Sequence, residues 1–247
     1  MPTLLFIHGH PFDSSMWRPQ IHHFTARGWN VKAPDLRGYG SAPVTEGTVT
    51  LPEFAADLLG AIDDEPVVVC GLSMGGQIAM EFVHAYPDRV AALVLADTSP
   101  AAETAAGRTA RRRRADEITE HGMAAYAEEL LPGMLAPATI RNNPDLARYV
   151  HRMMGDAPAR GAAAALRGRA ERRDYGATLL TLDLPTLVVV GREDTFTPVE
   201  EAEATAKMLR NGRLVVIENA GHLPNLEAAG AFNTAVDSFL ASAVQRR

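Results

Sequence analysis

The stretch PVVVCGLSMGGQIAMEF, residues 66–82, decides which fold we expect for this chain. It starts with a short apolar run, Val67 to Cys70, which has the length and β-branched composition of a buried strand. Ser73 follows between glycines, and the residues after it repeat apolar side chains at helical spacing until Pro87. A serine between a strand and a helix, with glycines two residues away on either side, is the pattern of a nucleophile elbow.

The physical basis of this pattern is the position of Ser73 on the turn. The hydroxyl stands at the N-terminus of the following helix, where free backbone N–H groups stabilise developing negative charge. The turn holds the serine at backbone angles that cost roughly 1–3 kcal/mol, and flanking glycines let neighbouring backbone approach closely. The plainer alternative is a helix N-capped by Ser73 after a glycine-rich loop. The five residues from Gly71 to Gly75 do not by themselves decide between these interpretations.

Composition limits the class of protein and its partners. The 247 residues, 47% apolar and 22% charged, suit one α/β domain with or without a subdomain. Lys and Arg total 24 against 30 Asp and Glu, and the net charge of −6 disfavours nucleic acid or an anionic membrane as partner. No apolar run approaches the roughly 20 residues of a membrane span, and the first residues lack the features of a secretory signal.

We therefore expect a cytoplasmic protein without a membrane segment. Cys70, the only cysteine, excludes an internal disulfide and is expected to fill the core. The sequence does not specify the oligomeric state, and a homodimer is compatible with it. No Cys/His cluster has metal-ligand spacing and no glycine-rich nucleotide loop is present, so we expect neither a metal nor a cofactor.

Six apolar runs of strand length alternate with segments of helix length. This alternation predicts βαβ units, hence an α/β three-layer sandwich with a mostly parallel sheet of about six strands covered on both faces. The expected strands are residues 4–8, 30–33, 67–70, 91–96, 186–190 and 214–217, and the main expected helices are 17–27, 51–62, the segment closed by Pro87, and 228–244.

Residues 101–182 break the alternation because they contain no strand-like run and are rich in Ala and Arg. We predict short helices interrupted at Pro132, Pro137, Pro144 and Pro158, forming a helical lid inserted in a core made of residues 1–100 and 183–247. The arginines at 111–114 are balanced by nearby acids, which favours a solvated helix face over a nucleic-acid patch. Apolar lid residues either pack the helices together or line a substrate pocket, namely Met123, Met134, Leu135, Met153 and Met154.

The rest of the chain supplies partners for Ser73. A serine hydroxyl needs an adjacent base that is itself oriented by a third group. Asp194 follows the expected strand 186–190, and His222 follows the expected strand 214–217. Because the carboxyl ends of parallel strands share one edge of the sheet, we expect Ser73, Asp194 and His222 to meet there.

Two backbone N–H groups are candidates for an oxyanion hole. They belong to Met74, directly after the nucleophile, and to His10, in the loop after the first strand. The His10 ring either reaches the pocket or has a structural role. Candidates for substrate binding are Trp17, Met134, Phe196 and Leu223, although a tryptophan packed in the core is the alternative for Trp17.

Five blocks, in this order, resemble the α/β-hydrolase superfamily, in particular its small serine esterases and enol-lactonases. They are HGHP at 8–11, DLRGYGSA at 35–42, GLSMGG at 71–76, GREDTFTP at 191–198 and AGHLPN at 220–225. The order Ser73, Asp194, His222 is that of the family's triad. Some relatives place the acid at the position of Asp97, but the motif around Asp194 favours Asp194. The resemblance implies structural roles for Asp35 and His8.

Members of this superfamily usually carry a β-hairpin before the first of these blocks, and this chain begins almost at that block, so we expect six strands rather than eight. The resemblance implies a carboxylesterase that cleaves a small ester through an acyl-enzyme. An enol-lactonase, a cofactor-free perhydrolase or a haloperoxidase-like enzyme is the alternative, and a non-catalytic binding protein of the same fold is a third. Dehalogenases on this scaffold carry aspartate at the elbow, so Ser73 disfavours that chemistry.

Overall fold

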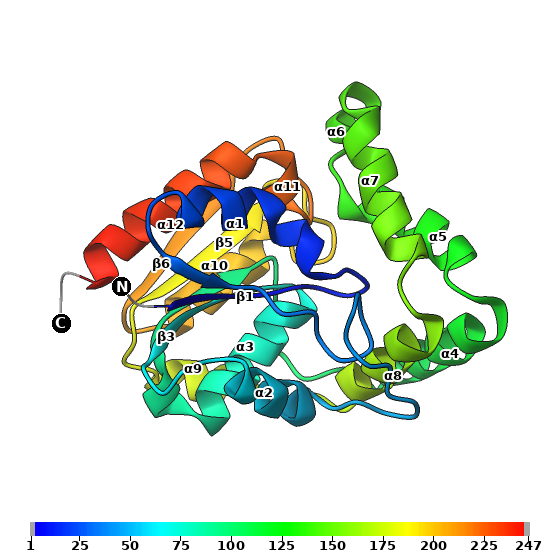
Figure 1. The fold of residues 1–247 in the computed structure, drawn as a ribbon, viewed down its shortest axis with the longest axis horizontal. Helices are drawn as coiled ribbons and strands as arrows, with labels where there is room; N and C mark the ends of the chain where they lie inside the picture. The colour runs from blue at the N-terminus through cyan, green and yellow to red at the C-terminus, as the bar shows by residue number, and fades with distance from the viewer. Residues whose placement is uncertain (1–2, 245–247) are drawn as a thin grey trace.

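A parallel sheet of six strands lies between two layers of helices in the computed structural model, which describes residues 3–244 (Figure 1). The strands are β1 (Thr3–Ile7), β2 (Asn30–Lys32), β3 (Val67–Leu72), β4 (Val90–Ala96), β5 (Thr186–Gly191) and β6 (Gly212–Ile217). Their order is β2-β1-β3-β4-β5-β6, and each neighbouring pair is parallel. The predicted three-layer α/β fold is confirmed. Residues 1–2 and 245–247, which the predicted core includes, lie outside the described residues.

The inner strands are buried on both faces, which explains their continuous apolar sequence. Every residue of β1, β3 and β5 is buried. Side chains alternate between the faces, so Leu5 and Ile7 of β1 enter one hydrophobic cluster while Leu4 and Phe6 enter the other. One face is covered by α1 (Arg18–Thr25), α11 (Pro224–Glu227) and α12 (Ala229–Val244), and the other by α2 (Leu51–Gly60), α3 (Met74–Ala85) and α10 (Val199–Met208). Two short 3-10 helices, η1 (Ser14–Trp17) and η2 (Pro87–Arg89), precede α1 and β4.

The long connection from β4 to β5 is helical, and residues 101–182 contain no strand. Its helices are α4 (Ala105–His121), α5 (Ala124–Met134), α6 (Pro137–Asn142), α7 (Pro144–Gly155), α8 (Ala159–Ala170) and α9 (Gly176–Thr181). Helices α4 to α8 project to one side of the sheet in Figure 1, whereas α9 lies with the core layer and contacts α10. The insertion expected at 101–182 thus includes one helix that packs with the core. No helix within residues 3–244 has the length and apolar character needed to cross a bilayer.

Asp35 stabilises the loop after β2, as the sequence predicts. Its carboxylate accepts hydrogen bonds from the Ser14 N–H at 2.9 Å and from the Ser41 N–H and hydroxyl, each at 2.8 Å. Partial burial opposes ionisation, but these hydrogen bonds outweigh it and lower the pKa of Asp35 to about 2. The loop is therefore fixed to the segment that precedes η1.

Helix α8 rests directly on the loop between β2 and α2. A Cβ atom on Gly161 would lie 2.0 Å from the Gly38 carbonyl oxygen, and one on Gly168 would lie 1.7 Å from the Val49 carbonyl oxygen. The Val49 N–H also donates to the Ala164 carbonyl at 3.1 Å. Helix α8 is therefore held backbone against backbone, at a distance that only glycine permits.

We predict that Gly168→Ala destabilises the protein, although alanine is the better helix former. The added methyl group would press on a backbone carbonyl, and such overpacking costs about 1–3 kcal/mol of unfolding free energy. Urea unfolding followed by circular dichroism measures this change. Gly155→Ala in α7 is the control, because a Cβ there meets nothing within 4 Å. Equal stabilities for the two variants would contradict the prediction.

Candidate active site

Ser73 lies on a strained turn between β3 and α3. Its backbone angles are φ 56° and ψ −115°, outside the usual regions for a residue with a side chain. The end of β4 holds this turn, because the Ser73 N–H donates to the Ala96 carbonyl at 2.9 Å and the Thr98 hydroxyl donates to the Ser73 carbonyl at 2.8 Å. The Ser73 side chain makes no capping hydrogen bond to α3. This conformation matches an elbow rather than an ordinary helix cap.

The glycines around Ser73 are required by close backbone contacts. A Cβ atom on Gly71 would lie 2.2 Å from the Gly75 carbonyl oxygen, and one on Gly75 would lie 2.1 Å from the Ile7 carbonyl oxygen. Gly76 is equally confined, since its Cβ would lie 2.5 Å from a Thr98 side-chain carbon. The start of α3 can approach β1 only because these positions have no side chain.

His222 and Asp194 form a buried hydrogen-bonded pair beside the elbow. His222 Nδ1 lies 2.9 Å from Asp194 Oδ2, and the Phe196 N–H donates to the other carboxylate oxygen at 2.8 Å. His222 and Ser73 both line a cavity of about 450 Å³. Because Nδ1 is engaged by Asp194, the other ring nitrogen remains to accept a proton from Ser73. The structure thus brings the three predicted residues together at the carboxyl edge of the sheet.

The loops that carry Asp194 and His222 are joined to each other. A Cβ atom on Gly191 would lie 1.9 Å from the Gly221 carbonyl oxygen, and the Glu193 N–H donates to the Ala220 carbonyl at 2.9 Å. Glu227 accepts a 2.7 Å hydrogen bond from the Gly221 N–H. These contacts fix the distance between the acid and the histidine.

Asp97 lies next to this pair but does not bind the histidine. Its Oδ1 accepts a 2.8 Å hydrogen bond from the Gly191 N–H, and its backbone has a φ of 47°. Burial, and then the charge of Asp194, hold the pKa of Asp97 well above its usual range. The carboxylate that contacts His222 is that of Asp194, whereas Asp97 bonds the Gly191 N–H, so the geometry favours Asp194 as the acid of the triad.

Within residues 3–244, the side chains of Asp97, Asp194 and His222 are close enough to one another to be considered as ligands of a metal ion. One side-chain atom from each of Asp97, Asp194 and His222 lies within 4.8 Å of the others. However, the histidine nitrogen and carboxylate oxygen are hydrogen-bonded directly to each other at 2.9 Å, which leaves no space for an ion between them. The direct contact is therefore between the histidine and Asp194, with Asp97 beside it.

The two predicted oxyanion donors remain free. None of the hydrogen bonds within residues 3–244 uses the backbone N–H of His10 or of Met74. His8 supports the loop before His10, because its Nε2 accepts the Leu36 N–H at 2.9 Å while its Nδ1 lies 2.9 Å from the Gly9 carbonyl oxygen. Burial lowers the pKa of His8, so its ring is neutral, as this pair of contacts requires.

The His10 ring lies in the cavity wall, between two phenols. Its Nδ1 is 2.7 Å from the Tyr39 hydroxyl and its Nε2 is 3.2 Å from the Tyr126 hydroxyl. Burial, with the nearby charge of Arg169, lowers the pKa of His10 well below its usual value. A neutral ring with both nitrogens engaged joins the Tyr39 loop to α5 and holds the His10 backbone in place.

Only part of the expected substrate pocket lies at this cavity. Met134 and Phe196 line it, and the Phe196 ring lies 5.0 Å from the His222 ring. Trp17 and Leu223 are fully buried in the core, where the Trp17 ring packs 4.8 Å from Phe6, so neither lines the cavity. The other apolar lid residues named above are buried but do not line the cavity, namely Met123, Leu135, Met153 and Met154.

The structure also places polar residues in the cavity that the sequence does not indicate. Arg111, Arg169 and Arg172 line it together with Glu103 and Gln77. Gln77 has a weak signal in the sequence, since it stands one helical turn after Ser73. The arginines have none, because their position depends on how the inserted helices pack.

Of the arginine run at 111–114, only Arg111 departs from the predicted solvated face. Arg111 turns toward the cavity and bonds Glu103. The other three arginines form surface ion pairs, namely Arg112 with Glu171, Arg113 with Glu117, and Arg114 with Glu117 and Glu129.

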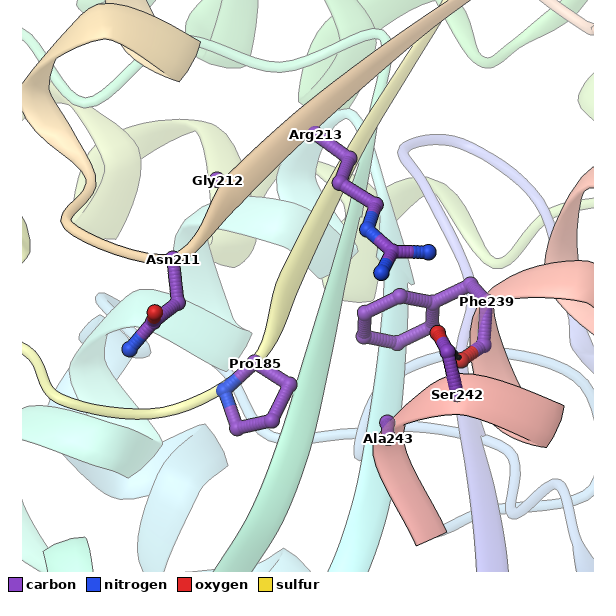
Figure 2. Close-up of a pocket in the computed structure, with 7 residues that line it drawn as sticks. All are labelled: Pro185, Asn211, Gly212, Arg213, Phe239, Ser242 and Ala243. Carbon is purple, nitrogen blue, oxygen red and sulfur yellow. Dashed lines mark hydrogen bonds between the residues drawn. The ribbon is translucent and has the colours of Figure 1, made fainter. Parts of the chain in front are cut away.

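A second hollow lies at the opposite edge of the sheet (Figure 2). It is formed by Pro185 before β5, by Asn211 to Arg213 at the start of β6, and by α12 residues Phe239, Ser242 and Ala243. Its lining contains no histidine or carboxylate that could activate Ser242. This hollow therefore lacks the base that a serine nucleophile needs, whereas the Ser73 cavity contains His222.

Comparison with known proteins identifies the family of this chain. A model described as the alpha/beta hydrolase family matches residues 4–235. The chain belongs to this family. This confirms the resemblance that the five sequence blocks indicate.

The relatives of this α/β hydrolase include several ester-cleaving enzymes. A solved structure of a thermophilic esterase from Thermogutta terrifontis, with malate bound, has a TM-score of 0.95 and 36% identity and covers 98% of this chain and 90% of that one. A pimeloyl-acyl-carrier-protein methyl ester esterase of Neisseria meningitidis is 31% identical over 92% of this chain and 72% of its own. The 3-oxoadipate enol-lactonase 2 of Acinetobacter baylyi is 26% identical over 97% and 88%.

We predict that Asp194→Asn and Asp97→Asn have unequal effects on activity. An amide at 194 loses the charge that stabilises the histidine cation, and we expect kcat to fall by about 10³–10⁴. An amide at 97 still accepts the Gly191 N–H and tolerates a positive φ, so activity should stay within roughly tenfold. Kinetics on a 4-nitrophenyl ester compare the two variants. The reverse ranking would make Asp97 the triad acid.

The raised pKa of Asp97 also predicts how stability depends on pH. The folded protein retains a proton that the unfolded chain releases above about pH 4, so this contribution to stability is lost as the pH rises. Asp97→Asn has no such proton, and its melting temperature should exceed that of the unmodified protein at pH 8, with the difference shrinking toward pH 4. Thermal unfolding at several pH values, with the exposed Asp88→Asn as control, measures this. A difference that does not vary with pH would contradict the prediction.

Proposed function

We propose that this protein is a serine hydrolase that cleaves a small carboxylic ester, a carboxylesterase. The observation that carries the proposal is the buried pair of His222 and Asp194 on the cavity that contains Ser73. A base oriented by a carboxylate beside a serine on a strained turn is the arrangement that activates a hydroxyl for attack on a carbonyl. The ester-cleaving relatives support the same reaction class.

The proposed reaction proceeds in two steps. His222 takes the proton of the Ser73 hydroxyl, whose oxygen attacks the carbonyl, while Asp194 stabilises the histidine cation. The oxyanion of the tetrahedral intermediate receives hydrogen bonds from the His10 and Met74 N–H groups, and its collapse releases the alcohol after His222 returns the proton. Water activated by His222 then hydrolyses the acyl-enzyme and releases the acid.

The substrate is a small molecule, since the cavity of about 450 Å³ is lined by residues of the sheet-edge loops and of the inserted helices. We propose that α4 to α8 act as the lid that shapes this space. Ring opening of a lactone needs the same groups, and the enol-lactonase relative makes this the second candidate. A perhydrolase differs only in the use of peroxide in place of water.

Fluorophosphonate labelling tests the mechanism. We expect intact protein to gain one label, found by mass spectrometry on the peptide that contains Ser73, and Ser73→Ala to gain none. Ser242→Ala is the matched control, because Ser242 lies at the other hollow, and it should label normally. Absence of label on the unmodified protein, or equal labelling of Ser73→Ala, would leave a non-catalytic binding protein as the better interpretation.

A further inference from the structure

The cavity beside Ser73 contains a positive charge that the proposed ester cleavage does not use. Arg169 of α8 is only 8% exposed and lines this cavity. Its Nε donates to the Gln77 side-chain oxygen at 3.2 Å, and no carboxylate within residues 3–244 forms an ion pair with it. A buried cation without a counter-charge is unfavourable in the free protein, so a bound anion would relieve it.

The other charges around the cavity do not neutralise Arg169. Glu103 bonds both Arg111 and Arg172, the latter at 2.6 Å, so this one carboxylate serves two arginines. Glu201, which also lines the cavity, is not paired with Arg169 either. Burial, followed by repulsion from Arg111 and Arg172, lowers the pKa of Arg169 well below its usual value. The environment therefore disfavours the cation unless an anion joins it.

Arg169 is connected to the helix of the nucleophile through Gln77. Gln77, which holds its Nε, lies four residues after Ser73 on α3, and the Gln77 N–H donates to the Ser73 carbonyl at 3.1 Å. Gln77 stands about one helical turn after Ser73, so the guanidinium is held against the helix that begins at the nucleophile. With Nε engaged, the two terminal nitrogens remain for a planar anion, which an arginine fork binds through two hydrogen bonds.

We propose that Arg169 binds a carboxylate of the substrate, so that the enzyme prefers esters or lactones that carry a second, free carboxylate. Glu103 and Glu201 on the same cavity favour a singly charged carboxylate over a doubly charged phosphate. This inference rests on the proposed function and names its substrate class.

A matched substrate pair tests the inference. Mono-4-nitrophenyl glutarate carries the free carboxylate, and its methyl ester has the same acyl chain without the charge. We expect kcat/KM of the unmodified protein to favour the acid, and Arg169→Met to lose about 10- to 100-fold on the acid, mainly through KM, while the methyl ester changes by less than about threefold. Arg169→Lys keeps the charge but not the fork, so its kcat/KM on the acid should lie between that of the unmodified protein and that of Arg169→Met.

Arg160→Met is the matched control, because Arg160 lies on the same helix, pairs with Glu46 and is exposed. It should leave both substrates unchanged. A readout without turnover uses glutarate itself, which should raise the melting temperature of Ser73→Ala protein and leave that of the Ser73→Ala, Arg169→Met double variant unchanged.

The outcomes separate the two proposals. Equal losses on both substrates, no preference of the unmodified protein for the acid, or equal glutarate stabilisation with and without Arg169 would each overturn the carboxylate site. Such results, obtained with a protein that still cleaves the methyl ester through Ser73, would leave the esterase assignment intact. No cleavage of either ester and no fluorophosphonate label would instead overturn the proposed function.

Discussion

The site depends on one constraint, the backbone conformation of Ser73. A serine at φ 56° is unfavourable by itself, and it persists because its neighbours fix it on every side. The end of β4 bonds both its N–H and its carbonyl, while the start of α3 presses on the end of β1 at Gly75. The central strands of the sheet therefore serve as the support of the nucleophile.

The same edge of the sheet organises the charges of the site. Asp194 contacts His222, and burial together with the charge of Asp194 holds the pKa of the neighbouring Asp97 well above its usual range. On the other side of Ser73, the inserted helices bring arginines into the cavity, and Arg169 forms no ion pair with a carboxylate of residues 3–244. One wall of the cavity thus performs the chemistry, while the wall from the inserted helices carries the charge that selects a substrate.

The fold could be predicted from the sequence because short local patterns indicate its strands and the starts of its helices. Continuous apolar runs mark strands that are buried on both faces, and prolines mark where helices of the insertion start, as Pro137 and Pro144 do for α6 and α7. The interruption predicted at Pro132 is wrong, because Pro132 lies inside α5. The positions of Asp194 and His222 follow from topology, because residues after parallel strands gather at one edge. Helix α9 shows the limit of such reasoning, since its sequence is helical but only packing assigns it to the core layer.

The sequence by itself determined the fold class and the three residues expected to carry the chemistry, because strand ends and glycine spacing are written along the chain. Only the tertiary structure decided that Trp17 and Leu223 belong to the core, that Asp97 bonds Gly191 instead of His222, and that Arg169 reaches the cavity. The place of Arg169 depends on how α8 packs against a loop far away in sequence, and the other two outcomes depend on which side chains the folded core surrounds. The serine elbow, by contrast, could be predicted from the sequence, because its close backbone contacts can form only at positions occupied by glycine.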